Sequence, residues 1–161
     1  MNNNDCVQEM RASYNNLMEK VDALYVRVST DQQVERGESI ETQKSRLLQY
    51  AKDKGLKPHV YEDAGYSAGD TNRPAYKKLI ADIKAGSVES VTITKLARIS
   101  RNLQDAVDLI YNTLDEHNVS LRALDQQFDT ATPMGKFMIN LLVTVAQWER
   151  EMISERVRID M

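Results

Sequence analysis

The sequence predicts an α/β domain with a mainly parallel sheet of four to five strands, flanked by helices and followed by a long C-terminal oligomerisation helix. Three observations predict this class. Short runs of β-branched and aromatic residues alternate four times with segments of helical periodicity. Glycine or asparagine separates most of these segments, and the last segment keeps a helical spacing of apolar residues. Strands that alternate with helices are typical of a parallel sheet covered on both faces.

Four short segments are predicted to be strands, because they combine valine, isoleucine, threonine or tyrosine with turn residues nearby. They cover residues 23–28, 59–61, 90–94 and 119–124. The polar stretches 29–38 and 62–72, which contain Gly37, Gly65 and Gly69, are predicted to be loops. In a sheet of this kind, binding sites form outside the carboxyl ends of the strands.

Three helices are predicted between the strands. Ser39 and Asn102 are residue types that cap helix N-termini, and Pro74 fits a first helical turn. Gly55 and Asn118 favour the left-handed conformation that ends a helix. These signals place the helices within residues 40–54, 74–86 and 102–118.

A final helix is predicted to open at Thr132-Pro133 and to run to the end of the chain. Its first half is apolar on nearly every side. One core cannot cover such a helix all round, so part of it is expected to pack on another subunit. The chain is therefore predicted to divide into a polar tail (1–21), a core (22–132) and a long dimerisation helix (133–161).

Composition limits the class of protein. The 161 residues carry a formal net charge of −3, so contact with nucleic acid would need a local basic cluster. No apolar run is long enough to span a membrane, and the N-terminus does not resemble a secretory signal. The single cysteine, Cys6, excludes an internal disulfide and fits a reducing compartment. We therefore expect a cytoplasmic protein.

Basic residues and hydroxyls follow three of the predicted strands. In chain order they are Arg27, Ser29, Ser67, Arg73, Lys95, Arg98 and Arg101. Guanidinium groups bind phosphate oxygens two at a time, and a serine oxygen can attack phosphorus and hold a covalent intermediate. The pattern favours phosphoryl transfer at one edge of the sheet. On spacing alone the alternative stays open, in which the serines are structural and the arginines form surface ion pairs.

Six motifs stand in order over residues 22–159. They are Tyr25-Val-Arg-Val-Ser-Thr-Asp-Gln-Gln33, Gly37-Glu-Ser-Ile-Glu-Thr-Gln43, Asp63-Ala-Gly-Tyr-Ser67, Asn72-Arg73-Pro74, Lys95-Leu-Ala-Arg98-Ile-Ser-Arg101-Asn102, and Glu149-Arg150-Glu151 with Glu155-Arg156. Together they resemble the serine recombinase family, which includes resolvases, invertases and large phage integrases. The second and fourth motifs look most like the large serine recombinase subgroup.

The resemblance implies a site-specific DNA recombinase that needs no metal or other cofactor. Ser29 would be the nucleophile that forms a 5′-phosphoserine bond with DNA. The scissile phosphate would be held by Arg27, Arg73, Arg98 and Arg101, with support from Gln33, Gln43, Ser67, Lys95 and Glu155. The partners would be double-stranded DNA sites and copies of the chain, a homodimer that forms a tetramer on DNA, with no membrane. Further DNA-binding domains would follow Met161 in the whole protein.

One position departs from the family pattern. Ala97 stands where the family usually has an aspartate, and alanine can neither transfer a proton nor orient an arginine. Two interpretations therefore stay open: an active recombinase, and an assembly module with an impaired active site. A third is a hydrolase of small phosphoesters, against which the sequence lacks a glycine-rich phosphate loop and clustered metal ligands. His59 and His117 are far apart in the chain and are interpreted as structural.

Overall fold

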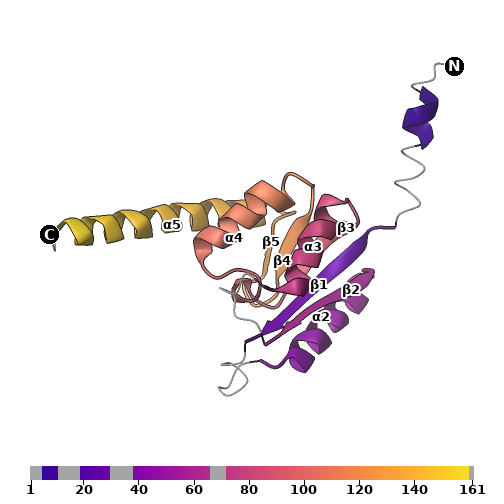
Figure 1. Ribbon diagram of the computed structural model, residues 1–161, viewed down its shortest axis with the longest axis horizontal. Coiled ribbons are helices and arrows are strands. Elements are labelled where there is room, and N and C mark those ends of the chain that lie inside the picture. The colour runs from indigo at the N-terminus through magenta and orange to yellow at the C-terminus, as the bar shows by residue number, and fades with distance from the viewer. Residues whose placement is uncertain (1–4, 11–18, 30–37, 66–71, 160–161) are drawn as a thin grey trace.

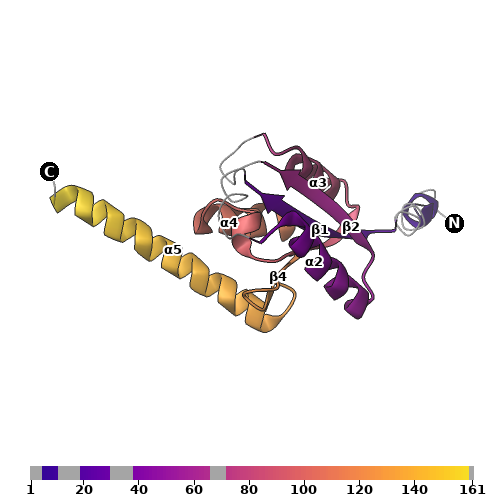
Figure 2. The same ribbon diagram turned by 90° about the horizontal axis from the view of Figure 1, so that it is seen from below.

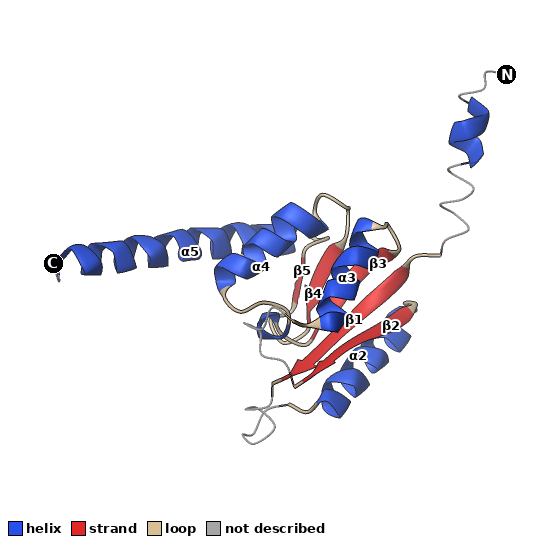
Figure 3. Ribbon diagram, viewed as in Figure 1, coloured by secondary structure: helices blue, strands red, loops and turns tan. Residues whose placement is uncertain are grey.

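The computed structural model describes residues 5–10, 19–29, 38–65 and 72–159. Five strands form one sheet in the order β2-β1-β3-β4-β5 (Figures 1 and 3). The first four pair in parallel, and β5 is antiparallel to β4. The predicted, mainly parallel sheet is therefore confirmed. The strands are β1 (Val21–Val28), β2 (Pro58–Ala64), β3 (Val88–Ile93), β4 (Ser120–Ala123) and β5 (Phe128–Asp129).

Helices cover both faces of the sheet (Figure 2). They are α2 (Ile40–Lys54), α3 (Pro74–Lys84), α4 (Leu103–Leu109) and α5 (Pro133–Ile159), with a 3₁₀ turn η2 (Leu96–Arg98) and a π-helical turn η3 (Ile110–Leu114). Side chains alternate along β1, so Leu24 and Val26 pack with Leu47 of α2. Ala23 and Tyr25 join the larger apolar cluster on the opposite face.

The helix ends follow the capping signals in the sequence. The side chains of Ser39 and Asn102 each accept a hydrogen bond from the backbone N–H three residues later, at 3.1 and 2.9 Å. Gly55 and Asn118 have φ angles of 66° and 55°, the left-handed conformation expected after a helix. The start of α2 is therefore fixed at one residue, which matters for the site described below.

Several predicted boundaries were wrong; for example, β1 begins at Val21 rather than at residue 23, and β3 begins at Val88 rather than at residue 90. β2 continues to Ala64, so residues 62–64 are strand rather than loop, because Asp63 and Ala64 pair in register with Arg27 and Val28 of β1. The helix that begins after Asn102 changes to a π-helical turn at residue 110. The two-residue strand β5 was not located in the sequence, since so short a strand depends on its pairing with β4.

α5 extends away from the sheet (Figures 1 and 2). Its buried residues are Gly135, Ile139 and Ala146. Apolar side chains line one exposed side of its first half: Met134, Phe137, Leu141, Val145 and Trp148. At the other end of the chain, residues 5–10 form an exposed helical turn. No helix among the described residues is both long and apolar enough to cross a bilayer.

Candidate active site

Arg27, Ser29, Arg73 and Arg98 lie at the carboxyl ends of the parallel strands. Arg27 lies near the end of β1 and Ser29 directly follows that strand, Arg73 precedes α3, and Arg98 closes the η2 turn after β3. Their exposed fractions are 4%, 8%, 7% and 1% in chain order. Charged side chains are rarely buried without a reason in function or in ion pairing. The fold therefore gathers these residues into a candidate active site.

Main-chain carbonyls hold the guanidinium group of Arg27. Its Nε donates to the carbonyl oxygen of Arg98 at 2.9 Å, and its Nη2 donates to that of Ala97 at 2.8 Å. In return, Nη1 of Arg98 lies 3.4 Å from the carbonyl oxygen of Arg27. These contacts join β1 to η2. Since the acceptors are neutral, the bonds orient the arginine without cancelling its positive charge.

Arg73 reaches the same region from the start of α3. Its Nη1 donates to the carbonyl oxygen of Ile99 at 3.1 Å and to the Tyr25 hydroxyl at 3.3 Å. Its guanidinium carbon lies 4.0 Å from the centre of the Tyr76 ring, a cation–π contact. The ring and the two acceptors restrict the orientation of the Arg73 side chain.

Asp63 is a member of this site to which the sequence analysis gave no role. It is fully buried on β2 and accepts a hydrogen bond from the Tyr25 hydroxyl at 2.8 Å. It also accepts the backbone N–H groups of Ala75 and Tyr76, both at 2.9 Å. Asp63 thus caps α3 from a neighbouring strand, where the N-cap residue makes no side-chain cap. Asp63 stands two residues after the buried Tyr61, and residues at this spacing in a strand lie on the same face of the sheet. This spacing was the signal in the sequence that could have indicated a buried carboxylate.

Burial shifts the ionisation of the clustered groups. It lowers the pKa of Arg27, and the nearby charges of Arg73 and Arg98 lower that pKa further. It also lowers the pKa of Arg98 and raises the pKa of Tyr25, which stays a neutral hydroxyl. Arginine starts from so high a pKa that these groups remain charged at neutral pH. The site is therefore suited to a bound anion.

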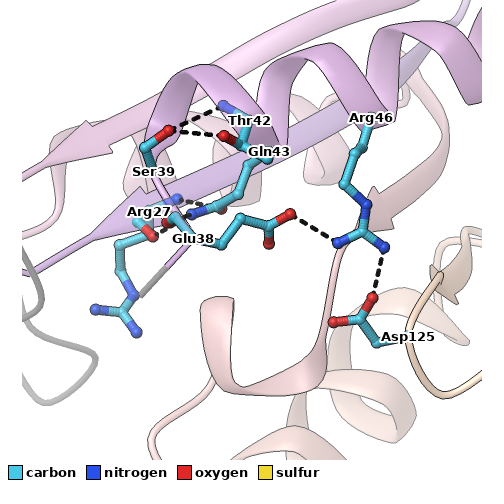
Figure 4. Close-up of polar contacts among 7 residues, drawn as sticks. All are labelled: Arg27, Glu38, Ser39, Thr42, Gln43, Arg46 and Asp125. Carbon is cyan, nitrogen blue, oxygen red and sulfur yellow. Dashed lines mark hydrogen bonds and ion pairs between the residues drawn. The ribbon is translucent and has the colours of Figure 1, made fainter. Parts of the chain in front are cut away.

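Gln43 connects the start of α2 to β1 (Figure 4). Its Oε1 accepts the N–H of Arg27 at 3.3 Å, and its Nε2 donates to the carbonyl oxygen of Arg27 at 3.1 Å. The same Nε2 donates to the carbonyl oxygen of Glu38 at 3.1 Å. Gln43 is fully buried, so this amide fixes the backbone on both sides of the segment 30–37.

The remaining predicted site residues lie elsewhere or outside the described residues. Lys95 is half-buried just before η2. Arg101 is exposed, with Nε 3.4 Å from Asp105 Oδ2. Glu155 is exposed on α5. Gln33 and Ser67 lie outside the described residues. Within the described parts of the chain, no three His, Cys, Asp or Glu side chains gather as metal ligands.

Comparison with known proteins identifies a family and several relatives. Residues 23–161 match the family described as the resolvase N-terminal domain. The chain is 31% identical over 134 residues to a DNA-invertase of Enterobacteria phage P7, across 83% of this chain and 64% of the relative. It is 30% identical over 134 residues to the transposon Tn552 resolvase of Staphylococcus aureus, across 82% and 61%. The chain thus spans less than two thirds of these relatives.

Two solved structures are similar in sequence as well as fold. The N-terminal catalytic domain of TP901-1 integrase has a TM-score of 0.76 and 35% identity, covering 83% of this chain and 98% of that one. A resolvase family site-specific recombinase from Streptococcus pneumoniae has a TM-score of 0.72 and 34% identity, covering 87% and 94%. Both likenesses extend over most of the described residues.

Proposed function

The chain belongs to the resolvase N-terminal domain family of serine recombinases, and from this membership we propose that it is the catalytic domain of an enzyme that cuts and rejoins double-stranded DNA at specific sites. One observation carries the proposal. Ser29 lies at the end of β1, two residues after Arg27, in the same buried group as Arg73 and Arg98. A hydroxyl beside fixed cations fits nucleophilic attack on a phosphodiester.

The proposed chemistry balances as two transfers of one phosphoryl group. Ser29 Oγ loses its proton and forms a bond to phosphorus, while the bond from phosphorus to the 3′ oxygen breaks. The 3′ oxygen gains a proton, and the 5′ end stays attached as a phosphoserine. In the second transfer a 3′ hydroxyl of the exchanged strand attacks the phosphoserine and releases Ser29. The energy of the phosphodiester is conserved, so no external energy source is required.

The arginines would supply the electrostatic stabilisation. Negative charge on the nonbridging oxygens rises as Ser29 attacks, and positioned cations stabilise it most where water is excluded. Arg27 and Arg98 are already oriented by backbone contacts, and Arg73 by its ring and carbonyl partners. Lys95 and Arg101, less buried, would contact DNA beside the scissile phosphate.

Strand exchange needs at least two active subunits on each DNA site. The exposed apolar side of α5 supports a homodimer, because large apolar patches on a helix are normally covered by a partner. We propose a dimer of the free protein and a tetramer on DNA. In such an assembly, Glu155 of α5 would approach an active site only after the subunits pack together.

The first test is the loss of the nucleophile. Ser29→Ala should abolish the covalent protein–DNA adduct, because it removes the oxygen that is proposed to attack phosphorus. The measurement is adduct formation by the whole protein on a nicked duplex, read on a denaturing gel. Ser45→Ala, which removes an exposed serine of α2, is the matched control and should leave the adduct yield unchanged. An adduct with Ser29→Ala would rule out this assignment.

A second interpretation is that the chain is an assembly module with impaired chemistry. It is favoured by Ala97, where the family usually has an aspartate, together with the apolar side of α5. The same adduct assay separates the two interpretations. The unaltered protein would then associate normally and form no adduct.

A further inference from the structure

We propose that Arg46 is a positioning residue for the Ser29 reaction, acting through the carboxylates of Glu38 and Asp125, which it bridges. This inference rests on the proposed function. Arg46 lies on α2, outside the group of arginines assigned to the phosphate, and the sequence analysis gave it no role.

Arg46 joins two segments that are far apart in the sequence (Figure 4). Its Nη1 lies 2.7 Å from Glu38 Oε1, and its Nη2 lies 2.6 Å from Asp125 Oδ1. Glu38 stands just before the first turn of α2, and Asp125 follows β4. A guanidinium group has forked N–H donors and can bind both carboxylates in a fixed geometry, whereas an ammonium group is a single point of charge.

The ion pair between Arg46 and Glu38 is connected to the nucleophile through Gln43. The carbonyl oxygen of Glu38 accepts a hydrogen bond from Gln43, whose amide also holds both backbone groups of Arg27. Ser29 follows two residues later on the same strand end. Arg46 fixes the Glu38 side chain while Gln43 fixes its backbone, so the bridge stabilises the support on which Ser29 is presented.

The ion pair between Arg46 and Asp125 is connected to the η2 turn through Thr94. The backbone N–H of Asp125 donates to the carbonyl oxygen of Thr94 at 2.8 Å. Thr94 lies between β3 and the η2 turn that carries Arg98 and the carbonyl oxygens that hold Arg27. Through Glu38 and Asp125, Arg46 therefore connects the support of the nucleophile to the η2 turn that carries Arg98.

The bridge also balances charge near Arg98. Burial lowers the pKa of Arg98, while Glu38 and Asp125 both raise it, so both carboxylates act on this arginine. Hydrogen bonds to Asp125 and Glu38 raise the pKa of Arg46 itself. Without Arg46, the two carboxylates would lose the cation that they share.

A bridge that is merely structural would behave differently. The side chains of Arg46, Asp125 and Glu38 are 41%, 39% and 16% exposed, so the pair with Asp125 contributes little to stability and the less exposed pair with Glu38 contributes more. Alanine is also a strong helix former, so Arg46→Ala should leave the fold of α2 intact. A structural bridge would therefore change neither the fold nor the reaction rate by much, whereas a positioning bridge changes the rate.

The main test is single-turnover adduct formation by the whole protein at saturating nicked duplex. Arg46→Ala should slow the reaction about ten- to a hundredfold, because small errors in the placement of reacting groups are costly. The dissociation constant for DNA should change less than about twofold, since Arg46 is already paired. Arg46→Lys should recover part of the rate. Asp125→Asn should also slow adduct formation. The variant that combines Arg46→Ala with Asp125→Asn should form the adduct no more slowly than Arg46→Ala alone, because both substitutions break the same bridge.

Lys44→Ala is the matched control. Lys44 lies on the same helix and pairs with Glu62 at 3.0 Å, so the substitution removes one cation and one ion pair of α2. It should keep the unaltered rate. Equal rates for Arg46→Ala and Lys44→Ala would overturn the inference and leave the proposed function untouched.

An independent readout needs no DNA. In the 161-residue chain with Cys6→Ser and Ser29→Cys, the pH profile of alkylation by iodoacetamide reports the thiolate at position 29. Arg46→Ala should move its midpoint upward by about half a pH unit, because two carboxylates lose their cation, and Lys44→Ala should not. An unmoved midpoint would overturn the inference. If the unaltered whole protein forms no adduct but the midpoint moves, the proposed function fails and the coupling between Arg46 and residue 29 stands.

Discussion

At the scale of single residues, the position of Arg27 depends on the backbone of the η2 turn. The carbonyl oxygens of Ala97 and Arg98 accept its N–H groups at 2.8 and 2.9 Å. The side chain at position 97 is exposed and takes no part in these two bonds. A change of side chain there leaves the main-chain acceptors in place. The family aspartate at this position is therefore not needed to orient Arg27 by these contacts.

Ala97→Asp should change the cleavage rate by less than about tenfold. A positioned general acid is typically worth about 100- to 10,000-fold, so the substitution tests whether such an acid is missing. Single-turnover cleavage of a nicked substrate by the whole protein, with and without Ala97→Asp, gives the comparison. Ala97→Asn, of similar size but without an acidic proton, is the control. A gain of about a hundredfold or more for aspartate alone would mean that Ala97 silences this enzyme.

At the scale of elements, the corner between β5 and α5 is closely packed. Gly135 donates its N–H to Thr132 Oγ1 at 2.9 Å, and that hydroxyl donates to the Asp129 carbonyl oxygen at 2.8 Å. A methyl group built on Gly135 would overlap the backbone of Asp129 and lie 3.0 Å from Thr132 Oγ1. Glycine is therefore required here for close approach of two backbones.

Gly135→Ala should destabilise the domain by about 1–3 kcal/mol, because the backbone of β5 or α5 must move to admit the methyl group. Urea denaturation followed by circular dichroism measures the free energy of unfolding. Lys136→Ala, at the next and exposed position, should stay within about 0.5 kcal/mol of the unaltered chain. Equal stabilities for the two variants would mean that the corner relaxes without cost.

α5 also carries the surface that is expected to join two copies. Met134, Phe137, Leu141, Val145 and Trp148 recur at steps of three and four, and their exposed fractions are 38% or more. We expect the 161-residue chain to dimerise, and Leu141→Asp to weaken the dimer at least about tenfold, because it would bury an uncompensated carboxylate. Sedimentation equilibrium measures both. Gln147→Asp adds the same charge at a polar exposed position and should have little effect. A chain that stays monomeric at high concentration would contradict this prediction.

At the scale of the whole molecule, the net charge limits DNA binding. The chain carries −3 overall, so attraction to a duplex comes from a local group of arginines. We expect the 161-residue chain to bind duplex DNA with a dissociation constant of about 10–100 µM at physiological salt, and equally for different sequences. If the arginines neutralise about three phosphates, a plot of the logarithm of the association constant against the logarithm of the salt concentration should have a slope near −3. Fluorescence anisotropy measures both, and tight sequence-selective binding would refute the prediction.

The local signals in the sequence were sufficient for most of the secondary structure. Caps at Ser39 and Asn102 and the left-handed residues Gly55 and Asn118 act within one helical turn, so single residues reveal them. The grouping of Arg27 with Arg98 was predictable in outline, because parallel strands end at one edge of a sheet. Neither the extension of β2 nor the two-residue β5 was predictable, since each depends on pairing with a neighbouring strand.

The sequence by itself determined the alternation of strands and helices and the family motifs, because these depend on periodicity and on order along the chain. Only the tertiary structure decided which groups hold the arginines of the site. Asp63 caps α3 from β2, main-chain carbonyls hold Arg27, and Arg46 reaches Asp125 across 79 positions of sequence. The physical reason is that hydrogen-bond partners are chosen by proximity in space. Proximity between strand ends follows from the register of the sheet, which no local pattern encodes.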